Sequence, residues 1–111
     1  MERTLKTLTK LDGRVYVFLA NDEAGKAFLA QAEAEGMLFG TGTNPTDNPY
    51  ATVMAINHDG TLNYVGANGM IAFQAGADTV GGERLICVDY EKYASGETNF
   101  LIHQKREHLI N

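Results

Sequence analysis

The chain has 111 residues, of which 44% are hydrophobic and 21% are charged, as in ordinary soluble globular proteins. This length predicts one domain, residues 1–111, that buries roughly two thirds of the surface its unfolded chain exposes. Fourteen acidic and nine basic residues give a net charge of −5. Because a basic footprint is missing, we expect no nucleic-acid partner.

Cysteine usage and apolar run lengths indicate the compartment. Cys87 is the single cysteine and lies in an apolar run, so we expect a small buried side chain in a reducing compartment. No apolar run approaches the ~18 residues of a membrane span, and residues 1–7 lack a signal-peptide core. We therefore expect a cytoplasmic protein without a membrane partner.

The first elements flank a turn at Asp12-Gly13. Residues 4–11 carry leucines at helical spacing, but three threonines favour an extended chain, and we expect a short strand or ordered arm. Residues 15–20, Val-Tyr-Val-Phe-Leu-Ala, are apolar throughout. A strand that is apolar on both faces is typical of the centre of a sheet.

An amphipathic helix follows. Asn21 and Asp22 are its candidate N-cap residues, and Gly36 is its expected end. Its apolar positions fall on one face, which we expect to pack on a sheet: Ala24, Phe28, Leu29 and Ala32.

The rest of the chain is mostly extended. We expect a short strand at residues 37–39, a hairpin formed by residues 51–56 and 61–65, and a last strand at residues 85–90. Between these, residues 67–73 make a short helix or irregular ledge, and residues 75–82 a mobile surface loop. The tail has a break at Gly96, an apolar clasp at residues 100–102 and a potential terminal helix at residues 102–110.

This order predicts an α+β fold: an antiparallel-rich sheet of four to five strands with one main amphipathic helix on one face. The second face is then polar, covered by the tail, or used for self-association. One group of large apolar residues suits an interface, but we expect an ordinary core for it: Met54, Ile56, Tyr64, Met70 and Phe73.

Residues 40–44, Gly-Thr-Gly-Thr-Asn, have the composition of a ligand-binding loop. Glycine frees backbone N–H groups, and the side chains add donors and acceptors, which together can cradle phosphate or ribose oxygens. The loop is not a P-loop, because no Gly-Lys-Ser/Thr is present. The alternative is a plain connection in which Pro45 and Pro49 set the turns. The predicted ligand site comprises Gly40, Thr41, Gly42, Thr43, Asn44, Asn68, Met70, Phe73 and Arg84.

Arg14 and Arg84 each begin a predicted strand. They could meet at one end of the sheet and hold an anion, the alternative being two separate surface charges.

Neither metal binding nor catalysis is indicated. His58 lies at the predicted hairpin tip, and His103 and His108 are five residues apart, which misses the i, i+4 pairing of a zinc site. Nothing near Cys87 in the sequence would lower its pKa, and Ser95, the only serine, lacks an elbow motif. We expect no enzyme, no catalytic residues, no metal and no cofactor.

Several segments resemble a group of small, mostly uncharacterised proteins carried by prophages and integrative elements of gut Firmicutes. The resemblance covers about residues 14–98 and includes Val-Tyr-Val-Phe, Ala-Glu-Ala-Glu-Gly, Phe-Gly-Thr-Gly-Thr-Asn-Pro-Thr, Asn-Tyr-Val-Gly, Met-Ile-Ala-Phe and Val-Asp-Tyr-Glu-Lys-Tyr-Ala-Ser-Gly-Glu. It implies an accessory protein of the host bacterial cytosol and carries no catalytic residues to transfer.

Small phage proteins of this kind are often counter-defence factors. The resemblance therefore implies a homo-oligomer that sequesters a small nucleotide-derived immune signal in inter-subunit pockets, similar in style to anti-Thoeris and anti-CBASS sponges. The alternative is an acidic protein inhibitor of a bacterial defence complex, similar in style to anti-CRISPR proteins, with an acidic face made of Asp22, Glu23, Glu33 and Glu35. A small enzyme acting on such a signal is the third hypothesis.

Overall fold

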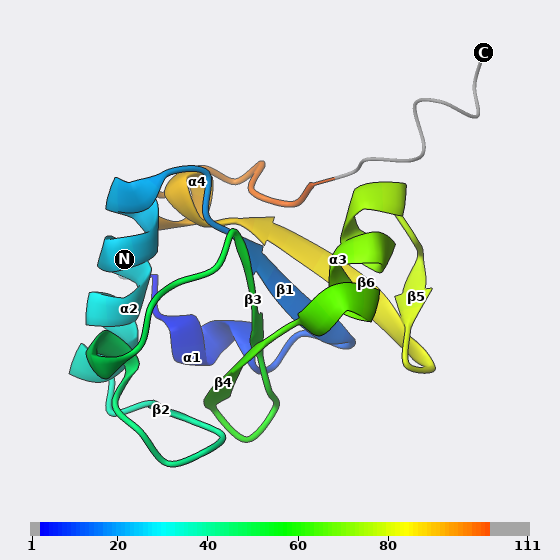
Figure 1. Ribbon diagram of the computed structural model, residues 1–111. Helices are drawn as coiled ribbons and strands as arrows, with labels where there is room; N and C mark the ends of the chain where they lie inside the picture. Colours follow the sequence, from blue (N-terminus) through cyan, green and yellow to red (C-terminus); the bar gives the residue numbers. More distant parts are fainter. Residues whose placement is uncertain (1–2, 103–111) are drawn as a thin grey trace.

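In the computed structural model, which describes residues 3–102, six strands form one mixed sheet in the order β2-β4-β3-β1-β6-β5 (Figure 1). β3 is antiparallel to β1 and β4, and β5 to β6, whereas β1–β6 and β2–β4 are parallel pairs. The strands are β1 Arg14–Phe18, β2 Leu38–Phe39, β3 Val53–Ile56, β4 Thr61–Tyr64, β5 Thr79–Val80 and β6 Glu83–Asp89. The helices are α1 Leu5–Leu8, α2 Asp22–Ala34, the 3-10 turn η1 Pro45–Asp47, α3 Gly66–Ala75 and α4 Tyr90–Ala94.

The α+β class is as predicted, but the details differ. The sheet has six strands where four to five were expected, and two of its five pairings are parallel. The additional strand, β5, falls in the segment predicted to be a mobile loop. It is ordered by pairing with β6, and the Leu85 amide donates to the carbonyl of Asp78 at 2.9 Å. β5 and β6 form a hairpin across Gly81-Gly82, and a strand of two residues is too short to be recognised from an alternating apolar pattern.

β1 is the central strand, as its composition predicted. Its middle three residues are buried, because α1 and α2 cover one face and α3 the other. Val15 and Val17 point into the larger core beneath α2, while Tyr16 points toward α3. Strand alternation therefore divides one apolar run between two cores.

α2 forms the main cover of the first face. The side chain of Asn21 accepts a hydrogen bond from the Ala24 amide at 2.8 Å and caps the helix. The predicted apolar face is confirmed, with Phe28 fully buried against the sheet. Gly36 follows the C-cap with a φ of +80°, a conformation that glycine adopts without strain.

The N-terminal segment was predicted to be extended, and this was wrong. Leu5–Leu8 form one helical turn, because the Thr4 side chain accepts from the Thr7 amide at 3.2 Å and caps it. The turn is anchored by α2: the Glu35 carboxylate accepts from the amides of Leu5 and Lys6 at 2.8 and 3.0 Å. The threonines thus cap a helix instead of building a strand.

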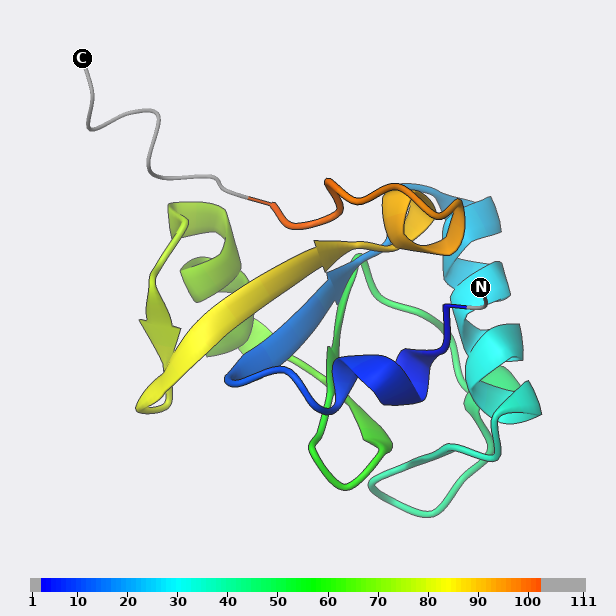
Figure 2. The same cartoon turned by 180° about the vertical axis from the view of Figure 1, so that it is seen from behind.

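The start of the described chain packs with α4 and the segment after it on the same side of the sheet, and Figure 2 shows this side. The Arg3 guanidinium lies about 5 Å from the centres of the Tyr93 and Phe100 rings, at 5.1 and 5.0 Å. It also donates to the carbonyls of Gly96 and Glu97 at the end of α4. The predicted clasp at residues 100–102 is confirmed, since Leu101 bridges to β6 and Phe100 packs on Tyr93. The expected helix at residues 102–110 falls almost wholly outside the described residues.

α3 covers the second face, where the sequence left open a helix or a ledge. Phe73 stacks on Phe18 with ring centres 5.8 Å apart. The helix approaches the sheet closely at Gly69, where an added Cβ would lie 2.8 Å from the Tyr16 hydroxyl. Met54 and Ile56 are 0% and 1% exposed in the first core, as expected. The second face has a smaller core of its own, formed by Tyr16, Val53, Ala55 and Phe73.

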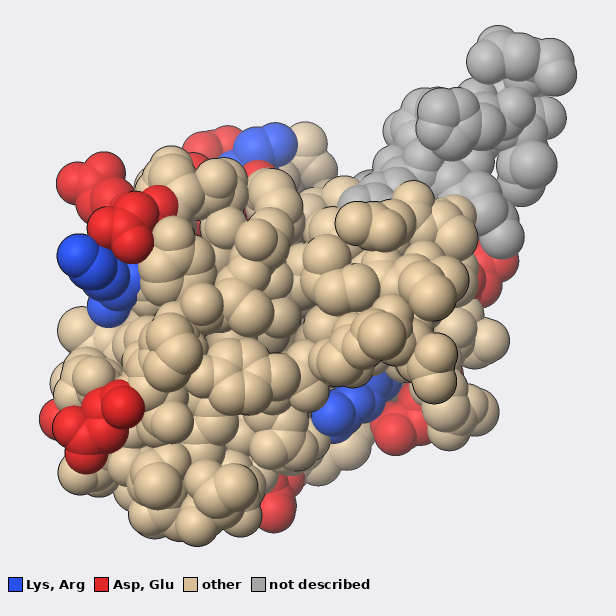
Figure 3. Space-filling model, viewed as in Figure 1, with Lys and Arg blue, Asp and Glu red and all other residues tan. Residues whose placement is uncertain are grey.

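The charged side chains are unevenly distributed. Most of the face seen in Figure 3 is uncharged, and the charges in view form a few separate groups, most of them along its outline. Of the 14 acidic and 9 basic residues, only Asp47 and Asp59 lie between Gly36 and Ala77. That stretch supplies β2, β3, β4 and α3, so half of the sheet and its second cover carry almost no formal charge.

We predict that Gly69→Ala lowers the free energy of unfolding by about 1–3 kcal/mol, as expected for overpacking. In an open helix the same change would stabilise by about 1 kcal/mol, but here the new Cβ would lie 2.6 Å from the Val65 Cβ. Urea unfolding followed by circular dichroism measures the effect. Gln74→Ala, at an exposed site of the same helix, should stay within about 0.5 kcal/mol of the unmodified protein. A Gly69→Ala protein as stable as the original would contradict this account of α3.

Candidate functional site

An open groove lies between α2 and the segment that follows η1. Its volume is about 520 Å³, within the range of pockets that hold small molecules. Most of the surface that lines it is apolar, and a few polar groups contribute the rest. The lining residues are Asp22, Lys26, Leu29, Thr46, Asn48, Pro49 and Tyr50. We call this site the α2–η1 groove.

Tyr50 lies against α2 at a glycine. A Cβ added to Gly25 would be only 2.3 Å from the Cγ of the Tyr50 ring, so the ring rests directly on the helix backbone. A glycine inside a helix costs about 1 kcal/mol relative to alanine. Here that cost is offset by close aromatic packing, which fixes Tyr50 as one wall of the groove. Leu29, 5% exposed, contributes to the apolar lining beside it.

The outer wall is held in place by side-chain hydrogen bonds. The Glu33 carboxylate accepts from the amide and the hydroxyl of Thr46, at 3.1 and 2.6 Å. Both bonds lower the pKa of Glu33, and the bond from the hydroxyl contributes more than the bond from the amide. The Asn48 side-chain amide donates to the Asn44 carbonyl at 2.8 Å, and the Tyr64 hydroxyl donates to the Pro49 carbonyl at 2.6 Å. The wall is thus fixed to α2 on one side and to β4 on the other.

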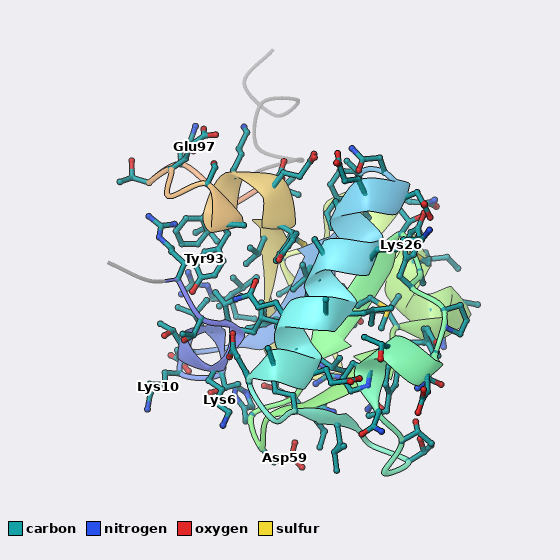
Figure 4. All side chains as sticks on the ribbon, turned by 90° about the vertical axis from the view of Figure 1, so that its left-hand side faces the viewer. Lys6, Lys10, Lys26, Asp59, Tyr93 and Glu97 are labelled. Carbon is teal, nitrogen blue, oxygen red and sulfur yellow. The ribbon has the colours of Figure 1, made fainter. Side chains whose placement is uncertain are left out.

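The groove has its charges at one end. Lys26 and Asp22 form an ion pair with 3.2 Å between Nζ and Oδ2. Both side chains are largely exposed, which makes the pair weak and its lysine available to an incoming anion. Figure 4 shows Lys26 at the outer side of α2. Burial, followed by the neighbouring Asp22 carboxylate, raises the pKa of Tyr50, so its hydroxyl remains a donor at neutral pH.

The predicted glycine–threonine loop borders the groove without lining it. Its residue Thr43 accepts from the Asn48 side chain at 2.9 Å and so supports the outer wall from behind. The loop closes on itself: the Gly42 amide donates to the Phe39 carbonyl, and the Gly40 amide to that of Leu62. Two of the backbone groups expected to cradle phosphate are therefore used within the protein.

The other predicted site residues lie elsewhere in the fold. Asn68, Met70 and Phe73 belong to α3, where Asn68 is exposed and Phe73 is buried against the sheet. Arg84 lies in β6, four strands from β2, or about 19 Å at the usual strand spacing of ~4.8 Å. One small ligand bound to a single subunit does not span these groups. The full predicted set stays a prediction.

Arg14 and Arg84 begin neighbouring parallel strands, but they do not face each other. Arg14 is in register with Leu85 and shares its face of the sheet, so alternation directs Arg84 to the opposite face. The Arg14 guanidinium donates instead to the Asn57 side chain. The two arginines form no joint anion site.

The sequence did not identify Lys26 or Asn48 as site residues. Tyr50 was one of four tyrosines that could stack on a base, but ordinary packing was expected for all four. The signal that was present is Gly25, a glycine in the middle of an otherwise regular amphipathic helix. Such a glycine often marks a close approach of another group, but the sequence does not say which. Tyr50 is 25 positions away, and only the folded chain joins the two.

The groups considered for catalysis lie apart from the groove. Cys87 is half-buried on the second face, and burial raises the pKa of its thiol to about 11. It is therefore a weak nucleophile at neutral pH. Within residues 3–102, no three His, Cys, Asp or Glu side chains come together as a metal ion would require. The same part of the chain has no helix with the length and apolar composition needed to cross a membrane.

No protein-family model matches the chain, and no curated protein or solved structure is detectably similar to it.

His58 joins the tip of the β3–β4 hairpin to two other segments. Its Nδ1 lies 3.1 Å from the Thr9 carbonyl and its Nε2 lies 3.3 Å from the Glu83 carboxylate. The bond with Thr9, followed by that with Glu83, raises the pKa of His58, while nearby Arg14 opposes the shift. The protonated ring, which can donate at both nitrogens, is therefore the form favoured by the fold.

We predict that His58→Ala destabilises the protein more at low pH than at high pH. The pKa of His58 is raised in the folded protein, so the stabilisation that His58 provides is fully present below its unfolded pKa of 6.5. This stabilisation is lost as the pH rises through the folded-state pKa. Thermal unfolding of His58→Ala and of the unmodified protein between pH 5 and pH 9 measures the gap in stability between them. The remaining histidines are common to both proteins and cancel in the difference. A gap that widens with rising pH would show that the neutral ring is the stabilising form.

Proposed function

We propose that the protein binds a small nucleotide-like molecule in the α2–η1 groove and holds it without converting it. The observation that carries this proposal is the composition of the groove: an aromatic ring fixed on a helix backbone, an apolar lining, and a cation at one end. A nucleotide presents a flat ring, polar edges and a negative phosphate, and each of these has a matching group.

The match can be followed group by group. The ring of Tyr50 offers a stacking surface for a base, an interaction that is sequence-tolerant and worth ~1–3 kcal/mol. The hydroxyl of Thr46 and the amide of Asn48 supply donors and acceptors for base or ribose edges. Lys26 would exchange its weak partner Asp22 for a phosphate, which carries more negative charge.

The surroundings of the groove suit binding more than chemistry. Its outer wall is fixed before any ligand arrives, through the bonds of Glu33 to Thr46 and of Tyr64 to Pro49. A preformed site loses less entropy when a ligand binds. In the setting that the sequence resemblance implies, the ligand is a nucleotide-derived immune signal of the bacterial host. The protein then acts as a homo-oligomeric sponge of a mobile element.

The alternative of an acidic protein inhibitor fits the helix less well. Of the four acidic residues considered, Glu35 accepts from backbone amides of α1, and Glu33 holds Thr46. Asp22 is paired with Lys26. A partner recognised by charge alone would have to compete with these internal contacts, which favours the small-molecule proposal.

We predict that a nucleotide probe binds the purified protein and that Tyr50→Ala weakens this binding about tenfold or more, because a stacked base on an aromatic ring contributes ~1–3 kcal/mol. Isothermal titration calorimetry with ADP-ribose and with a cyclic dinucleotide is the measurement. Gly25→Ala should weaken binding in the same way, since the new Cβ would displace the Tyr50 ring. Lys26→Ala should also weaken binding, since it removes the cation proposed to meet the phosphate. Its charge-matched control is Lys92→Ala, at an exposed lysine on α4, which should leave affinity unchanged.

Three results would contradict the proposal. The first is equal affinity in Tyr50→Ala, Gly25→Ala and the unmodified protein, which would exclude the groove. The second is a chemically altered nucleotide after heat release of the bound probe, which would indicate an enzyme. If neither probe binds, and native mass spectrometry of protein from cells producing immune nucleotides finds no added mass, the proposal fails. Salt-sensitive capture of a basic protein would then support the inhibitor.

A further inference from the structure

The uncharged stretch between Gly36 and Ala77 exposes apolar side chains. Among the described residues, three large hydrophobic side chains are exposed, and all three lie in this stretch: Leu38 at 41%, Tyr64 at 45% and Ile71 at 63%. Leu38 and Tyr64 lie on β2 and β4, the two strands at one edge of the sheet. Leu38 is in register with Thr61, so the two side chains flank this edge from opposite faces. We call this region the β4 edge; it comprises Leu38, Asn63 and Tyr64.

The β4 edge is incompletely covered within the chain. β2 has two residues and pairs only with Thr61 and Leu62, so in the described structure no strand lies beside Asn63 and Tyr64 on that side. The opposite edge differs, because β6 is flanked by β5 and then by Leu101. An open, uncharged edge with exposed apolar groups is the kind of surface that associates.

We propose that the β4 edge is the contact surface between two copies of this chain, related by a twofold axis. The distribution of charge distinguishes a second copy of the chain from a charged partner at this surface. Each copy carries a net charge of −5, so two copies repel except where their facing surfaces lack charge. The β4 edge meets this condition, and Figure 3 shows the broad uncharged area around it. A basic protein or a nucleic acid would find no complementary charge there.

The composition of the edge also suits a self-complementary contact. In a twofold interface each residue meets the same surface on the partner, and interface centres favour tyrosine and disfavour charged residues. Tyr64 supplies the ring, which already contacts Phe39 at 5.3 Å between ring centres. Asn63 supplies an exposed amide that both donates and accepts.

This contact would reach the α2–η1 groove. The Tyr64 hydroxyl donates to the carbonyl of Pro49, which lines the groove. A second copy on Tyr64 would therefore lie next to the groove wall. The inference deepens the homo-oligomer of the proposed function by naming its contact surface, and it does not require that a ligand be bound.

The test is the mass of the full-length protein in solution. Light scattering after size-exclusion chromatography should give about twice 12.1 kDa for the unmodified protein and 12.1 kDa for Tyr64→Glu. Leu38→Glu is the second variant, because it leaves the Tyr64–Pro49 bond intact. The control, Ala94→Glu, adds the same charge at an exposed position on α4 and should remain dimeric. Added salt should preserve or strengthen the dimer, since it screens repulsion between acidic copies.

A monomeric unmodified protein would overturn the inference, and so would a dimer that persists in both Tyr64→Glu and Leu38→Glu. Nucleotide titration of the Leu38→Glu monomer separates this failure from failure of the proposed function. Binding by the monomer supports the groove whether or not the β4 edge forms the dimer.

Discussion

Burial of β1 on both faces is the constraint on which the rest of the structure depends. A strand whose middle residues are all apolar must be covered twice, and the chain supplies α2 with α1 on one side and α3 on the other. The two covers differ in construction. α2 is long and anchors Phe28 in the larger core, whereas α3 is short and reaches the sheet only because Gly69 has no side chain. Each helix then gives the molecule a different surface.

Two charged side chains tie the ends of the described chain together. Glu35 caps the first turn through two backbone amides, and Arg3 closes the end of α4 between two aromatic rings. Figure 4 shows Tyr93 beside the N-terminal segment, to which it donates a hydrogen bond at the Thr4 carbonyl, 2.6 Å away. These contacts connect the two ends of the described chain. In the stretch between Gly36 and Ala77, by contrast, charge has a local role at the β3–β4 turn, where Asp59 accepts from the amide and the hydroxyl of Thr61.

Local patterns predicted the elements whose causes are local. The helix from Asp22, the β3–β4 hairpin and the central strand all follow from spacing, capping and turn residues in the sequence, and all are confirmed. The prediction of an extended segment was wrong for Leu5–Leu8, because threonine favours strands on average, whereas Thr4 acts here as a helix N-cap. The prediction of a loop at residues 75–82 missed β5 because the strand has only two residues and because glycine favours loops, although Gly81-Gly82 form the hairpin turn to β6. The groove was missed because Gly25 and Tyr50 meet only after folding.

The β4 edge is connected to the groove wall by the hydrogen bond from the Tyr64 hydroxyl to the Pro49 carbonyl, and this bond links the two proposals physically. Residues 46–50 form the outer groove wall, held to α2 by Glu33 and to β4 by Tyr64. A second copy packed on Tyr64 would reinforce its bond to Pro49, which already fixes the wall in one copy, and so would favour the form of the groove that a ligand binds. By linkage, a ligand that stabilises the wall would favour the dimer by the same factor. Ligand affinity and self-association are therefore expected to rise together, through a single hydrogen bond between a side chain and a backbone carbonyl.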